Sequence, residues 1–146
     1  MRRRRDVECA AEGVTPHVLY ALNAGLRFLL EIASLIALGR VGYASASGAL
    51  GYALAAALPL MAASAWGVFT VPGDPSRGKT GPVPVSGRVR LLLEALCFAA
   101  GAAAFWRTGD ERVAIVFGAG VLFHYACGHA RTRWLLRGAT GSPPRA

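Results

Sequence analysis

Residues 49–71 run for 23 consecutive positions without a charged side chain. As an α-helix with a rise of about 1.5 Å per residue, this run extends about 35 Å and exceeds the roughly 30 Å hydrocarbon core of a bilayer. Trp66 and Phe69 lie near its end, where aromatic side chains commonly meet the membrane interface. Pro59 lies near its middle, and membrane helices tolerate such a residue. The segment therefore predicts a membrane-spanning helix.

Three further segments have a length and an apolar content that fit the same environment. Apolar residues make up 54% of the chain and charged residues 16%, below the ~25% that is usual for soluble domains. Thr15 and Pro16 suit the start of the first helix, as a cap residue followed by proline. We predict an all-α membrane protein with four transmembrane helices in one domain, residues 15–136. The helices are expected at about 16–39, 49–71, 87–106 and 113–130.

The remaining segments are polar. Residues 1–14 are expected to form a basic N-terminal tail, residues 72–86 a Gly/Pro-rich loop, and residues 137–146 a disordered tail. The net charge is +8, and the basic residues gather in these segments and just after the last helix. Because positively charged loops stay in the cytoplasm, we predict a bacterial cytoplasmic (inner) membrane protein with both termini and the loop on the cytoplasmic side.

The same charge distribution predicts which partners the chain has. Basic residues next to apolar helices favour the anionic headgroups of membrane lipids over nucleic acid. The sequence is also compatible with a homo-oligomer. The arginines expected at the headgroups are Arg2, Arg3, Arg4, Arg5, Arg131, Arg133 and Arg137.

Two of the predicted helices carry the same pair of opposite charges. The stretch LRFLLEIASL places Arg27 and Glu31 four residues apart, and VRLLLEALCF does the same with Arg90 and Glu94. Residues at this spacing share one face of a helix. The repeat predicts two tandem helical hairpins, a 2+2 arrangement whose halves are related by an axis along the membrane normal.

These pairs, together with Asn23 one turn before Arg27, are the candidate functional residues. Charges inside a bilayer cost at least ~2.5–3.5 kcal/mol each, so pairing is expected. If the first and third helices are neighbours, Arg27 can pair with Glu94 and Arg90 with Glu31. The first interpretation is a structural or accessory protein, not an enzyme, in which this cluster holds the bundle together. The alternative is a small transporter in which Glu31 and Glu94 are coupling carboxylates for a proton or a cation.

Other motifs do not predict a site. GDPSRGKT, from Gly73, matches a phosphate-binding loop, but an apolar helix precedes it and prolines follow it, where that loop needs a strand and a helix. His124 and His129 are five residues apart and do not share a helix face. We therefore predict no metal, no cofactor and no catalytic residue.

The segments LNAGLRFLLEIASLIALG, WGVFTVP and RVRLLLEALCF together resemble the YrdB-like family of small bacterial membrane proteins, a family of unknown function. The resemblance covers about Leu22 to Leu136. It implies a four-helix integral membrane protein, and it brings no substrate, cofactor or catalytic residue. The chain departs from the family in its long Gly/Pro loop and its Arg-rich start.

Overall fold

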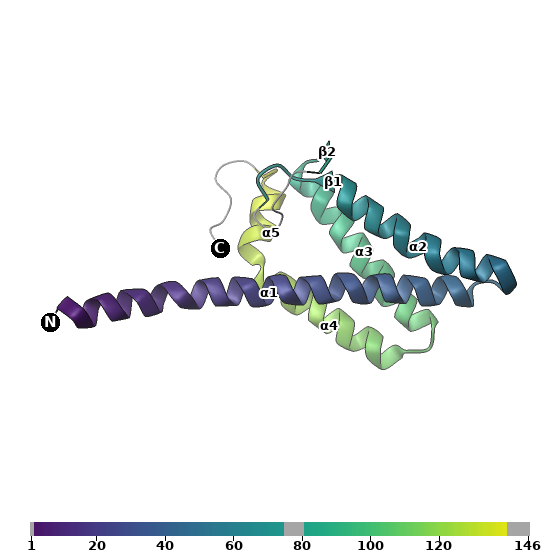
Figure 1. Ribbon diagram of the computed structural model, residues 1–146, viewed down its shortest axis with the longest axis horizontal. Coiled ribbons are helices and arrows are strands. Elements are labelled where there is room, and N and C mark those ends of the chain that lie inside the picture. Colours follow the sequence, from purple (N-terminus) through teal and green to yellow (C-terminus); the bar gives the residue numbers. More distant parts are fainter. Residues whose placement is uncertain (1, 75–80, 140–146) are drawn as a thin grey trace.

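The computed structural model describes residues 2–74 and 81–139, with side chains from Val18 onward. The described chain is helical apart from one pair of two-residue strands (Figure 1). In chain order the elements are α1 (Arg2–Ala44), α2 (Gly48–Val68), β1 (Phe69–Thr70), β2 (Val83–Pro84), α3 (Gly87–Arg107), α4 (Glu111–Cys127) and α5 (His129–Leu136).

Helix α1 is longer than predicted at both ends. It begins at Arg2, so the structure corrects the predicted start at Thr15 and the separate tail of residues 1–14. The preceding residues are rich in Arg, Ala and Glu, which favour helix, and the helix continues through Pro16. It also passes the predicted end at Gly39 and stops at Ala44.

Gly39 and Gly42 are packing positions for α2. A Cβ atom on Gly42 would lie 2.5 Å from the carbonyl oxygen of Leu54, and one on Gly39 would lie 3.3 Å from that of Ala55. The missing side chains let the backbones of α1 and α2 approach closely, as in many membrane helix pairs. A glycine that the sequence suggested as a helix end is thus a contact between two helices.

Three helical segments are long and apolar enough to cross a membrane: Val18–Ala44, Gly48–Val68 and Gly87–Arg107. The predicted fourth helix, residues 113–130, is instead two helices. Helix α4 ends at Cys127, and α5 leaves it at an angle of 75°. The bend falls at Gly128, where a Cβ atom would lie 3.1 Å from Nδ2 of Asn23. A fourth span exists only if this bent pair counts as one.

The chain between α2 and α3 is more ordered than the predicted loop of residues 72–86. Strands β1 and β2 pair in parallel, with Phe69 opposite Val83. The hydroxyl of Thr70 accepts a hydrogen bond of 2.6 Å from the amide of Gly81. Helix α2 accordingly ends at Val68, three residues before the predicted end. Residues 75–80, and residues 140–146 of the predicted tail, lie outside the described part.

Helix α5 lies across the end of the bundle, beside the strands and the start of α3 (Figure 1). Leu135 is fully buried and Trp134 nearly so, and both pack with Val71. The ring of Trp134 is therefore enclosed by the protein, although its neighbour Arg133 was expected at the lipid headgroups. Gly87 allows this contact, since a Cβ atom there would lie 2.8 Å from the Cα atom of Leu135. The short helix is therefore attached to the bundle.

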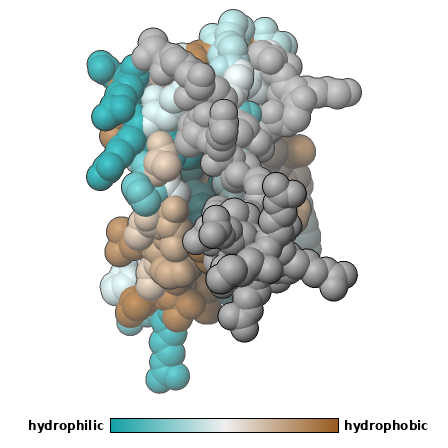
Figure 2. All heavy atoms as spheres, turned by 90° about the vertical axis from the view of Figure 1, so that its left-hand side faces the viewer, coloured by the Kyte–Doolittle hydropathy of each residue, from teal (hydrophilic) through white to brown (hydrophobic). Residues whose placement is uncertain are grey.

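The flanks of the bundle carry large exposed apolar side chains. Figure 2 shows hydrophobic residues gathered on one flank and hydrophilic residues above them. Such a surface is far more apolar than a soluble monomer exposes, and it suits lipid. The most exposed of these side chains include Phe28, Leu29, Leu50, Tyr52, Leu60, Met61, Ile115, Val116, Leu122 and Phe123.

The glycine contacts make a matched pair of variants informative. We expect Gly42→Ala to destabilise the protein, because its Cβ atom meets the backbone of Leu54. We expect Gly25→Ala, at an exposed helical position with nothing within 4 Å, to be neutral or to stabilise by about 0.5–1 kcal/mol. Unfolding of the purified protein in mixed micelles measures both. Equal effects would show that α1 and α2 do not pack through Gly42.

Candidate functional site: a buried charge cluster

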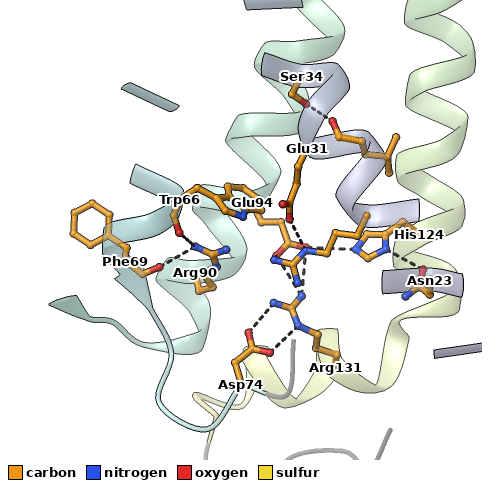
Figure 3. Close-up of polar contacts among 12 residues, drawn as sticks. Asn23, Glu31, Ser34, Trp66, Phe69, Asp74, Arg90, Glu94, His124 and Arg131 are labelled. Atoms are coloured by element: carbon orange, nitrogen blue, oxygen red, sulfur yellow. Dashed lines mark hydrogen bonds and ion pairs between the residues drawn. The ribbon is translucent and has the colours of Figure 1, made fainter. Parts of the chain in front are cut away.

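The carboxylate of Glu94, on α3, lies at the centre of a group of charged residues (Figure 3). Its side chain is fully buried. Arg27 on α1 approaches it to 3.3 Å, Arg131 on α5 to 3.2 Å, and Nε2 of His124 on α4 to 3.5 Å. Four helices therefore meet at one carboxylate. A charge buried this deeply is stable only when it is paired and hydrogen-bonded.

The polar side chains Asn23, Arg27, Glu31 and Ser34 form a stripe along α1 that faces the bundle, as their helical spacing predicts. Nε of Arg27 donates a hydrogen bond of 2.9 Å to Oε1 of Glu31. Ser34 is fully buried and packs against Gly101 on α3, where a Cβ atom would lie 2.7 Å from the serine hydroxyl oxygen. This close contact brings α1 and α3 together about two helical turns beyond Arg27 and Glu94. The distance of 3.3 Å between Arg27 and Glu94 confirms the predicted pairing of these two residues.

Arg90 has a different role from Arg27, although the sequence places the two alike. Its Nη1 atom donates to the carbonyl oxygens of Trp66, at 3.1 Å, and of Phe69, at 2.8 Å. The last carbonyl groups of a helix lack partners inside the helix, so Arg90 caps the end of α2. Its guanidinium also lies over the Trp66 ring, 4.4 Å from the centroid, and that of Arg27 lies 5.6 Å away. These contacts attach Arg90 to the end of α2, which the predicted symmetric exchange with Glu31 did not anticipate.

Arg131 joins the cluster from α5. It donates to both carboxylate oxygens of Asp74, at 3.2 and 2.8 Å, and to both oxygens of Glu94, at 3.3 and 3.2 Å. Its side chain is 11% exposed. Arg131 was predicted to contact lipid headgroups, and its burial between two carboxylates corrects that prediction. The two-oxygen geometry suits a guanidinium and would not be reproduced by lysine.

His124 links the cluster to Asn23 on α1. Its Nδ1 atom lies 2.9 Å from Oδ1 of Asn23, while Nε2 faces Glu94. Asn23 is thus confirmed as a member of the polar stripe. Its amide holds the imidazole ring in an orientation that points the second nitrogen at the buried carboxylate.

The cluster is balanced in charge. Three guanidinium groups and three carboxylates gather around Trp66 and His124, and each is in contact with an opposite charge or a backbone dipole. Pairing of this kind offsets the cost of burying charge and leaves little net field. The charged members are Arg27, Glu31, Asp74, Arg90, Glu94 and Arg131.

A cavity of about 240 Å³ adjoins the cluster. Its wall includes Glu31, Arg27, His124 and Arg131, with Trp66 beside them. Glu31 is the most exposed charge of the cluster, with a side chain 23% accessible, whereas Glu94 does not line the cavity. The two carboxylates that the sequence treats as equivalent therefore differ: one is enclosed and one faces open space.

Sequence reasoning missed three members of the cluster. Asp74 lies within a motif that resembles a phosphate-binding loop, His124 was considered only as a partner of His129, and Arg131 belongs to a basic segment near the C-terminal end. One signal was present, since Asp74 is an acidic residue in an otherwise basic loop. Contacts across 57 residues, from Asp74 to Arg131, follow only from the path of the chain.

The fold and the cluster define a class: a small all-helical protein whose span-length apolar helices surround a buried, charge-balanced centre. The chain belongs to the family described as protein of unknown function (DUF2568), whose model matches residues 25–122. It is also 41% identical to the uncharacterized protein YrdB of Bacillus subtilis (strain 168) over 114 residues. The matched region covers 78% of this chain and 93% of that protein. The predicted family is therefore confirmed. No solved structure matches the chain.

The unequal burial of the two carboxylates gives a graded prediction. Glu94→Gln leaves Arg27 and Arg131 without their shared buried partner, and we expect it to destabilise the protein by about 3–5 kcal/mol. Glu31→Gln should cost clearly less, since Arg27 retains Glu94 and Glu31 is partly exposed. Denaturant unfolding in micelles measures the difference. Equal costs for the two variants would mean that Glu94 is not the centre of the cluster.

Proposed function

We propose that the chain is an integral protein of the bacterial cytoplasmic membrane with four spanning segments and both termini in the cytoplasm. The bent pair α4 and α5 supplies the fourth segment, and α5 lies in the interface. The observation that carries the proposal is the exposed apolar surface on the flanks of the span-length helices. A spanning α4 returns the chain to the side on which α1 began.

The distribution of charge at the two ends supports this orientation. Arg88, Arg133 and Arg137 are at the end where α5 lies, and Arg88 donates to the carbonyl of Leu136. At the other end Arg40 forms an ion pair of 2.5 Å with Asp110, which offsets one of the few positive charges there. The more basic end is expected in the cytoplasm.

Within this architecture we assign the charge cluster a structural role and the protein a non-enzymatic, accessory one. The ion pairs and hydrogen bonds of the cluster connect α1, α3, α4, α5 and the segment after α2. The exposed arginines Arg133 and Arg137 then contact the anionic headgroups of the lipids, and the arginines at positions 2–5 are further candidates for such contacts. We do not propose nucleic acid as a partner of the protein.

Topology reporters test the architecture. Fusions at the N-terminus, the C-terminus and within residues 75–80 should all report cytoplasm, and a fusion at Gly109, in the turn between α3 and α4, should report the opposite side. A C-terminal fusion on the opposite side would show that α4 and α5 do not cross, and it would leave three spans.

A second candidate function is transport, with Glu31 as the coupling carboxylate. The observation that favours it is the cavity beside Glu31, which gives this one carboxylate access to a solute or a proton. Glu94 is a weaker candidate because it is enclosed by Arg27, Arg131 and His124. Intramembrane carboxylates next to open space are common in ion and proton pathways.

Infrared difference spectra between acidic and neutral pH test this candidate. A coupling carboxylate takes up a proton inside the bundle, so one component of the carboxylic acid band of wild type should be lost in Glu31→Gln and retained in Glu111→Gln. The control removes an exposed carboxylate at the far end of the bundle. Identical spectra for wild type and Glu31→Gln would exclude proton coupling through this residue.

A further inference from the structure

The wall of the cavity presents hydrogen-bond donors on one part and a carboxylate on another. Arg131 contributes a guanidinium group and Asn23 an amide, and Tyr20 contributes a hydroxyl. That hydroxyl is buried and has no hydrogen-bond partner among the described residues. Glu31 contributes a carboxylate, of which Arg27 engages one oxygen. Buried polar groups normally have partners, so the free hydroxyl and the partly exposed carboxylate indicate an occupant with both an acceptor and a donor.

The charge balance of the cluster limits the net charge of that occupant. Three guanidinium groups and three carboxylates already compensate one another, as described above. A bound cation or anion would add one uncompensated charge to a partly enclosed site, which is costly. A group with one positive and one negative charge adds none, and it can face the donors with its acidic end and Glu31 with its basic end.

Size and surroundings restrict the occupant further. At ~30 Å³ for each water-sized volume, the cavity of about 240 Å³ holds a group of roughly eight non-hydrogen atoms. A second cavity of about 160 Å³, lined mainly by apolar residues of α1 and α2, shares Glu31 and Trp66 with the first. Phe28, on the wall of the first cavity, is 60% exposed on the outer flank of α1. A headgroup can therefore enter from the flank, with an apolar chain beside it.

We propose that the cavity binds a small zwitterionic group, with its ammonium at Glu31 and its phosphate or carboxylate at Tyr20 and Arg131. The group is supplied either by a phosphatidylethanolamine headgroup or by a free solute of the same chemistry. This binding goes beyond the structural role of the cluster, and it shares with the transport candidate the cavity and the exposed Glu31. Binding without proton uptake leaves the inference intact, so the two fail separately.

Calorimetric titration of the full-length protein in detergent tests the charge pattern. The probes are the methyl ester of phosphoethanolamine, which carries one positive and one negative charge as the lipid headgroup does and is called phosphoethanolamine below, inorganic phosphate and ethanolamine. Wild type should bind phosphoethanolamine at least about tenfold more tightly than either single-charge probe, because only this probe satisfies both parts of the wall. Phosphate or ethanolamine binding as tightly as phosphoethanolamine overturns the proposal.

Variants assign the two ends of the ligand. Glu31→Gln should reduce the preference for phosphoethanolamine over phosphate about tenfold, Glu31→Asp should retain most of it, and the control Glu111→Gln should leave it unchanged. Tyr20→Phe should lower the affinities for phosphoethanolamine and for phosphate by similar factors, so the ratio of the two affinities should not change. It removes a hydroxyl without a described partner, so the fold should persist even if Glu31→Gln is unstable. An unchanged preference in Glu31→Gln, or unchanged affinities in Tyr20→Phe, contradicts the assignment.

Native mass spectrometry from nanodiscs separates the two sources. The discs contain phosphatidylethanolamine and phosphatidylglycerol in equal amounts. Selective retention of phosphatidylethanolamine by wild type, lost in Glu31→Gln, identifies a lipid headgroup. Binding of soluble phosphoethanolamine without lipid retention identifies a free zwitterion. If neither the soluble probe nor the lipid binds, the proposal is wrong.

Discussion

The buried carboxylate of Glu94 is the interaction on which the bundle depends. Arg27, Arg131 and His124 approach it from three other helices, and no single pair would compensate a fully enclosed negative charge. In an apolar medium helices gain little from hydrophobic association, so packing and polar contacts must specify their arrangement. A carboxylate with three partners defines relative positions that lipid-facing surfaces leave undefined.

The cluster also accounts for features of the chain that are otherwise unrelated. The bend at Gly128 lets α5 turn from α4 and bring Arg131 to Glu94. The segment after α2 brings Asp74 to the same arginine. Arg90 caps the carbonyl groups at the end of α2 and lies over Trp66. Each of these local irregularities places one charge or dipole near the centre of the bundle.

The two copies of the Arg/Glu motif have diverged in role. In α1 the pair binds within its own helix, and Arg27 reaches Glu94 as well. In α3 the arginine, Arg90, donates hydrogen bonds to the end of α2, and the glutamate, Glu94, pairs with residues of the other helices. One carboxylate is thereby committed to structure, and the other, Glu31, faces a cavity. The protein thereby has an enclosed carboxylate at its centre and, beside it, a carboxylate that faces a cavity.

The sequence by itself determined the helical class and the polar face of α1, because charge spacing and long apolar runs allow few alternatives in a bilayer. It also allowed the pairing of Arg27 with Glu94, on the condition that α1 and α3 are neighbours. Two glycines led to wrong helix boundaries: Gly39, the predicted end of the first helix, is a packing contact inside α1, and Gly128 lies at a bend inside the predicted fourth helix. Only the tertiary structure decided that Asp74, His124 and Arg131 complete the cluster and that Glu31 remains accessible. Those contacts join residues far apart in the chain, and the path of the backbone between them is not encoded in any local pattern.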